Sequence, residues 1–140
     1  MRWKSHQPAL SKRIGVQRRV ALVTGGSGGI GSKICKRLAQ DGIKVIVHYN
    51  QNKQQADRVV AEIEGFDGTA TAIGSDLSFK DGAVELVENA RRIFGKIDIL
   101  VNNASPKIMP SSFLQTEWKQ IQFQIDTQLR STFLLMKECA

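Results

Sequence analysis

The chain has 140 residues, of which 41% are hydrophobic and 24% are charged, a size and composition typical of one folded domain. No apolar run in it approaches the roughly 18 residues that a membrane-spanning helix needs, so an integral membrane protein is excluded and no membrane partner is expected. Two cysteines, Cys35 and Cys139, are too few for a disulfide scaffold, which excludes a small secreted module and favours a reducing, cytoplasmic compartment.

The net charge of +7 is concentrated at the amino terminus. Six of the 20 Lys and Arg residues lie within the first 19 positions, and the rest of the chain carries 14 basic against 13 acidic residues. A domain that reads nucleic acid carries its basic residues on a folded face, so nucleic-acid binding through this tail is the weakest of the hypotheses. We expect residues 1–18 to form a basic, flexible extension, with an organelle transit peptide as a less favoured alternative.

From residue 19 onward, short apolar runs alternate with segments of helical periodicity. Four runs have the length and the apolar or β-branched content of strands, namely residues 20–23, 43–47, 69–73 and 97–101. Helical periodicity follows each of them, at residues 30–39, 54–64, 81–94 and from 113 to the end. Residues 103–112 are predicted to form a loop.

This alternation predicts an α/β fold of the Rossmann type over residues 19–140. Strands so uniformly apolar are typical of a parallel sheet with helices on both faces. Right-handed crossovers favour the strand order 3-2-1-4, which leaves the fourth strand at an edge with an apolar face uncovered. In the last helix, a stripe at helical spacing is expected to face the core: Trp118, Ile121, Ile125, Leu129, Phe133 and Met136.

A glycine-rich turn joins the first strand to the first helix, in the segment 24–31 (TGGSGGIG). At such a junction the free N–H groups and the positive end of the helix dipole attract a diphosphate, and only glycine lets the backbone approach closely. Two spacings overlap, G-x-G-x-x-G on Gly26, Gly28 and Gly31, and a wider one on Gly25, Gly29 and Gly31. The alternative is an ordinary glycine-rich turn, but its place between strand and helix favours a dinucleotide site.

The end of the second strand bears on the choice of dinucleotide. A site for NAD places an acidic residue there to bind the ribose 2′-hydroxyl, whereas this chain has no acidic residue between Asp41 and Asp57. Four side chains of this region can instead donate hydrogen bonds to a 2′-phosphate: His48, Asn50, Asn52 and Lys53. NADP(H) is therefore favoured over NAD(H), although a polar loop without preference stays open.

Three motifs in order resemble the short-chain dehydrogenase/reductase family: the glycine turn, Asp76-Leu77 after the third strand, and the segment 102–105 (NNAS) after the fourth. The segment 45–49 (VIVHY) is similar to 3-oxoacyl-(acyl-carrier-protein) reductases, and the serine of NNAS to pteridine reductase-like members. Taken singly, Asp76 can be a helix-terminal residue and the two asparagines turn formers. The expected cofactor-binding residues are Thr24, Gly25, Ser27, Gly29, Ile30, Gly31, His48, Tyr49, Asn50, Asp76, Leu77, Asn102, Asn103, Ala104 and Ser105.

The resemblance also implies a catalytic Ser and a Tyr-x-x-x-Lys pair, with the lysine lowering the pKa of the phenol. Tyr49 and Lys53 have this spacing but follow the second strand, so we do not expect them to be catalytic. Gln128 stands where the family has a helix Asn, and no relay role is assigned to it. No catalytic residue and no metal site are therefore expected in this chain.

We accordingly expect an amino-terminal portion of an enzyme that transfers hydride between NADPH and a small carbonyl or alcohol substrate and that forms a homo-oligomer when complete. On its own the portion is expected to be inactive. The alternative is a non-catalytic dinucleotide-binding or sensor protein that is complete as it stands.

Overall fold

The computed structural model describes residues 19–106 and 112–140 of the chain. Four parallel strands form one sheet in the order β3-β2-β1-β4, as predicted. The strands are β1 Val20–Val23, β2 Lys44–Tyr49, β3 Ala70–Gly74 and β4 Ile99–Val101. The expected basic extension at residues 1–18 and positions 107–111 of the expected loop lie outside the described residues.

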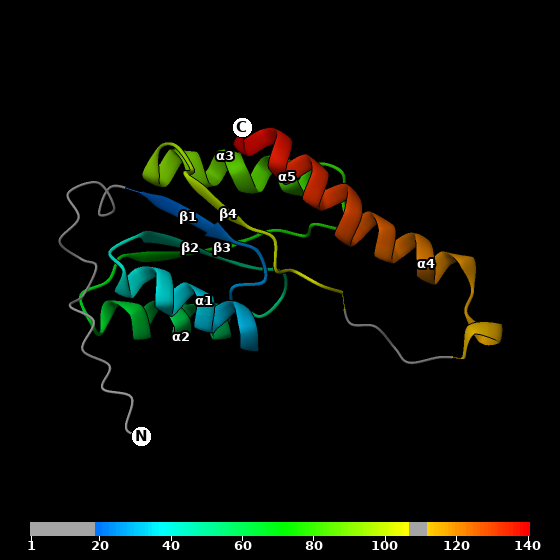
Figure 1. Cartoon of the computed structure of the whole chain (residues 1–140), viewed down its shortest axis with the longest axis horizontal. Helices are drawn as coiled ribbons and strands as arrows, with labels where there is room; N and C mark the ends of the chain where they lie inside the picture. The colour runs from blue at the N-terminus through cyan, green and yellow to red at the C-terminus, as the bar shows by residue number, and fades with distance from the viewer. Residues whose placement is uncertain (1–18, 107–111) are drawn as a thin grey trace, which may run out of the picture.

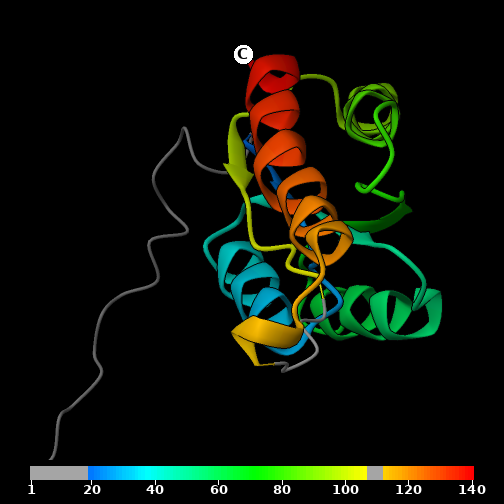
Figure 2. The ribbon, with the colours of Figure 1, turned by 90° about the vertical axis from the view of Figure 1, so that its right-hand side faces the viewer.

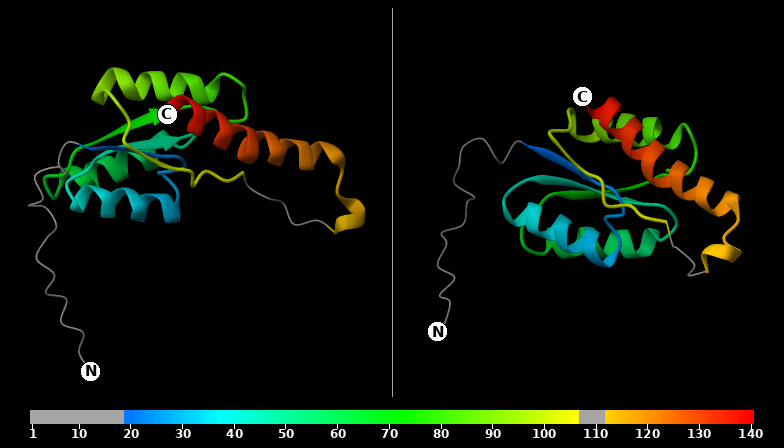
Figure 3. Two further views of the ribbon diagram at one scale, coloured as in Figure 1. Left: turned by 45° about the horizontal axis from the view of Figure 1, so that its top comes forward. Right: turned by 45° about the vertical axis from the view of Figure 1, so that its right-hand side comes forward.

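Helices cover both faces of this sheet. On one face lie α1 (Gly29–Gln40) and α2 (Lys53–Glu64), and on the other lie α3 (Gly82–Phe94) and α5 (Ser131–Cys139), as Figure 1 and the turned view in Figure 2 show. The two further views in Figure 3 give the same three layers. The predicted arrangement, a Rossmann-type sheet between helical layers, is confirmed.

Two apolar clusters hold the layers together, one on each face of the sheet. Leu22 and Ile46 belong to the cluster under α3 and α5, while the neighbouring residues Val23, Val45 and Val47 pack against α1 and α2. Successive side chains of a strand point to opposite faces, so a strand covered on both sides must be apolar at every position. This explains why the run 20–23 is continuous rather than alternating.

The strand β2 is longer than expected at its carboxyl end. It continues through His48 and Tyr49, which pair with Ile73 and Gly74 of β3. His48 is therefore part of a central strand and is 2% exposed, although the predicted strand ended at residue 47 and His48 was expected to donate to a ligand. The hydrogen bonds described below explain how a polar ring is accommodated there.

The last helical segment differs most from expectation. It consists of a short 3₁₀ turn (Phe113–Gln115), α4 (Trp118–Gln124), a π-helical segment η3 (Ile125–Arg130) and α5. The predicted core-facing stripe is wrong, because its six members are between 36% and 69% exposed. The face that packs on the sheet side contains Ser131 and Leu135 instead, and α4 extends past the strands, where no described element covers it (Figure 1).

Two apolar residues in the terminal turns of helices lie outside the core. Ile30, one of the expected cofactor-binding residues, is 72% exposed at the start of α1, and Ile93 is 51% exposed near the end of α3. Both lie in the terminal turns of their helices, where the end of the helix projects past the strands it covers. Within the described residues, none of the helices combines the length and apolar character that crossing a bilayer requires.

Candidate functional site

The glycine turn leaves β1 at the carboxyl edge of the sheet and folds back tightly into α1. Gly25 has φ +62°, a conformation that favours glycine. A Cβ at Gly31 would lie 2.2 Å from the carbonyl oxygen of Gly25, so a side chain there would force the turn and the helix apart. Gly28, in contrast, has φ −78° and only one contact, at 3.3 Å. The wider spacing, on Gly25, Gly29 and Gly31, therefore describes the geometry better than G-x-G-x-x-G.

Gly29 differs from these glycines, because a Cβ there would meet no atom of the described residues within 4 Å. It is the first residue of α1, and no side chain caps this helix end. The first N–H groups of a helix have no partner within the helix, and the positive end of the dipole lies beside them. The start of α1 thus offers backbone donors, positive potential and room for an anion.

Behind the turn, a buried thiol fills the space between α1 and β2. A Cβ at Gly26 would lie 3.0 Å from the Sγ of Cys35 and 3.0 Å from a methyl group of Val47. Burial raises the pKa of the Cys35 thiol to about 12, so the group stays protonated at neutral pH and behaves as an apolar filler. Gly26 thus serves packing rather than ligand approach.

Thr24 and Asn103 connect the glycine turn to the end of β4. The buried hydroxyl of Thr24 accepts hydrogen bonds from the backbone N–H groups of Asn103 (2.9 Å) and Ala104 (3.0 Å), and it donates to the carbonyl oxygen of Val101. The side-chain amide of Asn103 donates to the carbonyl oxygens of Thr24 (2.9 Å) and Gly25 (3.2 Å). Asn103 therefore holds the turn in place with both N–H groups of its amide nitrogen turned toward protein rather than toward a ligand.

His48 connects the same turn to the end of β3. The N–H of Gly25 donates to its Nδ1 (3.0 Å), and its Nε2 lies 2.9 Å from the carbonyl oxygen of Ser75. Nδ1 must then carry a lone pair and Nε2 the proton, so the ring is neutral. Burial lowers the pKa of His48, with the Ser75 carbonyl and Asp76 acting in the opposite direction. The expectation that His48 donates to a 2′-phosphate is corrected, because both ring nitrogens already have protein partners.

After β3, Asp76 and Leu77 divide their roles between side chain and backbone. The Oδ1 of Asp76 accepts from the N–H (2.9 Å) and the hydroxyl (2.7 Å) of Ser78, which leaves Oδ2 at the edge of the sheet. Leu77 is 5% exposed and its side chain belongs to the core, so only its backbone can face a ligand. Arg130 of η3 donates to the carbonyl oxygen of Ser78 and thereby ties this turn to the last helix.

After β4, Asn102 and Ser105 are exposed, and Ala104 is half-buried against the core. The side-chain amide of Gln128, in the π-helical segment, donates to the hydroxyl of Ser105 (2.9 Å). Gln128 thus contacts the end of β4 rather than only solvent.

Residues 19–140 match the sequence model of the family described as short chain dehydrogenase. The chain belongs to the short-chain dehydrogenase family. A 3-oxoacyl-[acyl-carrier-protein] reductase of Synechocystis is 39% identical over 119 residues, which cover 85% of this chain and 48% of the relative. An uncharacterized oxidoreductase of Methylorubrum extorquens is 46% identical over 89 residues, 64% of this chain and 36% of the relative.

Solved structures of the family agree in fold. A short-chain dehydrogenase of Burkholderia cenocepacia, in complex with NADP, superposes with a TM-score of 0.83 at 35% identity, over 89% of this chain and 50% of that one. A blue fluorescent protein from a metagenomic library, in complex with NADPH, has a TM-score of 0.80 at 31% identity, over 86% and 49%. This short-chain dehydrogenase chain therefore spans about half the length, or less, of the relatives it matches.

In this short-chain dehydrogenase chain, the Tyr-x-x-x-Lys spacing at Tyr49 and Lys53 lies at the end of β2 and the start of α2. The ring of Tyr49 packs over Gly74, on the β3 side of the sheet. The ammonium group of Lys53 is 2.7 Å from the carboxylate of Asp57, whose hydrogen bond raises the pKa of the lysine. In the strand order β3-β2-β1-β4, the strand β1 separates this corner from β4.

Sequence reasoning missed several residues that shape this edge. The hydroxyl of Ser75 donates to the carbonyl oxygen of Gly82 (2.7 Å), and a Cβ at Gly82 would lie 2.1 Å from the carbonyl oxygen of Asp76. The glycine at the start of α3 was a visible signal for this close approach. The contact of Arg130 with Ser78 joins positions 52 apart in the chain, and no local pattern announces it.

Proposed function

We propose that this chain is the dinucleotide-binding part of an oxidoreductase that transfers hydride between NADPH and a small carbonyl or alcohol substrate. The observation that carries the proposal is the start of α1, where uncapped backbone N–H groups adjoin the open space at Gly29. A diphosphate suits this place because it needs donors, positive potential and close approach to the backbone. The bound nicotinamide supplies the hydride chemistry, and the protein supplies binding and orientation.

The remaining candidates along the edge would hold the two ends of the cofactor. On the adenosine side, the Oδ2 of Asp76 and the backbone of Leu77 are suited to the adenine, and Asn50 to the ribose. On the nicotinamide side, the exposed Asn102 and Ser105 follow β4. Ligands of open α/β sheets bind outside the carboxyl ends of the strands, near the point where the strand order reverses. Here the order reverses between β1 and β4, which is where the glycine turn meets Asn103.

A preference for NADP(H) over NAD(H) is proposed on charge. The end of β2 carries no carboxylate that would repel a 2′-phosphate, and the exposed Lys53 nearby is cationic. Asn52 is engaged as the N-cap of α2, where its side chain accepts from the N–H of Gln55. The donors left for the phosphate are therefore Asn50 and, after release from Asp57, Lys53. An exposed ion pair contributes little, so this release is inexpensive.

The proton-transferring Ser and Tyr-x-x-x-Lys are proposed to lie outside these 140 residues. The chain contains one tyrosine, Tyr49, and its hydroxyl lies over Gly74. The whole enzyme is proposed to form a homo-oligomer, because the six-residue stripe from Trp118 to Met136, here called the outer stripe, exposes its large apolar side chains on α4, η3 and α5. Exposed apolar surface of this kind marks interaction sites.

The proposal is tested by titrating NADPH into the wild-type chain and a Gly29→Leu variant. The leucine has room in the protein but occupies the space assigned to the diphosphate, so affinity should fall by about tenfold or more. Gly65→Leu, at the carboxyl end of α2, is the matched control and should bind like the wild type. Equal affinities of Gly29→Leu and the wild type, with both folded by circular dichroism, would remove the basis of the proposal.

A further inference from the structure

His48 is a buried polar side chain whose two ring nitrogens are bonded to two different segments of the chain. On one side, Nδ1 accepts from the N–H of Gly25, the residue with φ +62° that opens the glycine turn. On the other side, Nε2 donates to the carbonyl oxygen of Ser75, directly after β3. The ring thus bridges the turn assigned to the diphosphate and the turn that carries Asp76, which is assigned to the adenine.

These two bonds require one protonation state and one tautomer of the ring. Nδ1 can accept from Gly25 only while it carries no proton, and Nε2 can donate to Ser75 only while it carries one. Protonation of Nδ1 would set two N–H groups against each other at 3.0 Å in a site that is 2% exposed. An unsatisfied buried donor is costly, so the turn at Gly25 would have to move away.

We propose that His48 is a positioning residue that holds the glycine turn in its dinucleotide-binding shape and releases it when the ring is protonated. This inference rests on the proposed dinucleotide function and adds a dependence on pH to it. Thr24 and Asn103 fix the turn from the β4 side through their hydrogen bonds to each other. His48 fixes it from the β2–β3 side by accepting from the N–H of the turn.

The groups around the ring set the pH at which release occurs. Burial lowers the pKa of His48 below its ordinary value of 6.5, while the Ser75 carbonyl and the charge of Asp76 act to raise it. Cys35, on α1 behind the turn, has a pKa near 12 and stays neutral throughout. On β2 itself the neighbour is Tyr49, whose ring packs over Gly74. The lowered pKa therefore keeps the ring neutral at pH 7.5, and acidification is needed to charge it.

Two substitutions separate the bonds of the ring. His48→Asn places a carbonyl oxygen near the position of Nδ1, so it can accept from Gly25, but it is too short to reach Ser75. His48→Gln places its amide near the position of Nε2, so it can donate to Ser75, but its acceptor lies beyond Gly25. Neither amide titrates between pH 5 and 8.

The experiment measures NADP⁺ affinity of the wild-type chain and both variants from pH 7.5 to 5. At pH 7.5, His48→Asn, which keeps an acceptor for Gly25, should bind about tenfold more tightly than His48→Gln, which leaves that N–H unsatisfied. Toward pH 5 the wild type should lose affinity relative to His48→Asn, by up to about tenfold per pH unit below the pKa of the ring. Because the 2′-phosphate of NADP⁺ titrates with a pKa near 6, the ratio of the two proteins is the quantity compared.

Ligand-free ¹⁵N NMR keeps this test independent of dinucleotide binding. The ring of His48 should show a protonated Nε2 and a bare Nδ1, and the amide of Gly25 should shift as the ring titrates. Parallel pH profiles of the wild type and His48→Asn, an Nδ1-protonated ring, or a Gly25 amide that ignores the titration would each overturn the proposal. If none of the proteins binds NADP⁺, the dinucleotide function fails, and the NMR titration alone decides the role of His48.

Discussion

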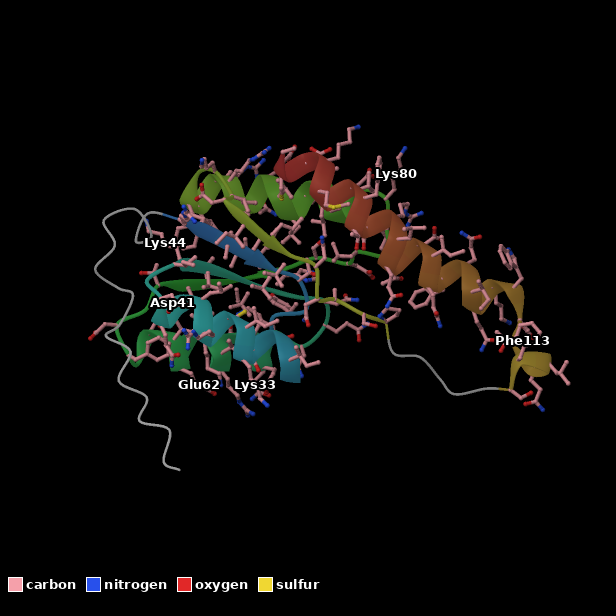
Figure 4. The ribbon with its side chains drawn as sticks, in the orientation of Figure 1. Lys33, Asp41, Lys44, Glu62, Lys80 and Phe113 are labelled. Carbon is pink, nitrogen blue, oxygen red and sulfur yellow. The ribbon has the colours of Figure 1, made fainter. Side chains whose placement is uncertain are left out.

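The carboxyl edge of the sheet and the outer helical segment α4–η3–α5 are opposites in how their side chains are accommodated. At the edge, the polar groups of Thr24, His48 and Asn103 are each bonded to protein groups from another strand end. On the outer segment, large apolar side chains such as Trp118 and Leu129 are 69% and 68% exposed. Phe113, in the 3₁₀ turn that precedes this segment, is 91% exposed and lies at the far end of the molecule, away from the sheet (Figure 4).

The polar groups of the edge are stabilised by contacts within this chain, whereas most apolar side chains of the outer segment are not. The edge has its shape because bonds between strand ends determine it, so a ligand meets a prepared site. The outer segment contributes a few residues to the core, Leu135 above all, and the rest of its apolar surface does not stabilise this chain. Substitutions in the two regions should therefore have very different effects on stability.

A large effect is expected within the glycine turn, where neighbouring glycines have different constraints. Gly31→Ala places a Cβ 2.2 Å from the carbonyl oxygen of Gly25, and overpacking of this kind should lower the free energy of unfolding by about 3 kcal/mol. Gly29→Ala meets no atom within 4 Å and should be neutral or stabilising by up to about 1 kcal/mol, because alanine favours a helix over glycine. Urea denaturation measures both, and a Gly31→Ala protein as stable as Gly29→Ala would contradict the packing at this turn.

The second comparison is made on one helix. Leu135→Ala removes a side chain that is 1% exposed in the core of α5 and should cost about 2 to 5 kcal/mol. Phe133→Ala removes a larger side chain that is 60% exposed and should change the stability of this chain by less than about 1 kcal/mol. Thermal or urea unfolding of the two variants shows which substitution lowers the stability more. A cost for Phe133 equal to that for Leu135 would show that the stripe faces the core after all.

A smaller effect is expected from the hydroxyl that joins β1 to β4. Thr24→Val keeps the shape of the side chain but leaves the N–H groups of Asn103 and Ala104 without their acceptor, which should cost about 1 to 3 kcal/mol. Thr24→Ser retains the oxygen and is the control. If valine and serine at this position prove equally stable in denaturant, the bond from Thr24 to the end of β4 does not help to hold the edge together.

The surface of the α1–α2 layer carries exposed ion pairs, one of them between the two helices. Lys36 and Glu62 form an exposed pair at 2.7 Å that joins the two helices, and in Figure 4 Lys33 and Glu62 point away from the sheet. Such pairs contribute little to stability. The apolar cluster beneath them, with Ala56, Val59 and Ile63, accounts for the packing of this layer.

The local pattern of apolar residues and glycines was sufficient to predict the order of strands and helices. The apolar runs at β1 and β2, the helical spacing of Cys35 and Ala39, and the glycine after α3 depend on interactions between near neighbours, so they could be read from the chain alone. The strand order followed from the handedness of crossovers. The end of β2 was predicted too early, because a buried histidine was not expected in a central strand.

The roles of individual side chains at the edge were decided by contacts between residues distant in the sequence. Asn103 and His48 were both expected to bind cofactor, and the tertiary structure directs their polar atoms into the protein, through bonds across 78 and 23 positions. The outer stripe has the spacing of a core-facing helix, but spacing shows only that one face is apolar. Which face meets the sheet depends on where the helix lies. The position of the helix is determined by the packing of α5 on the core through Leu135.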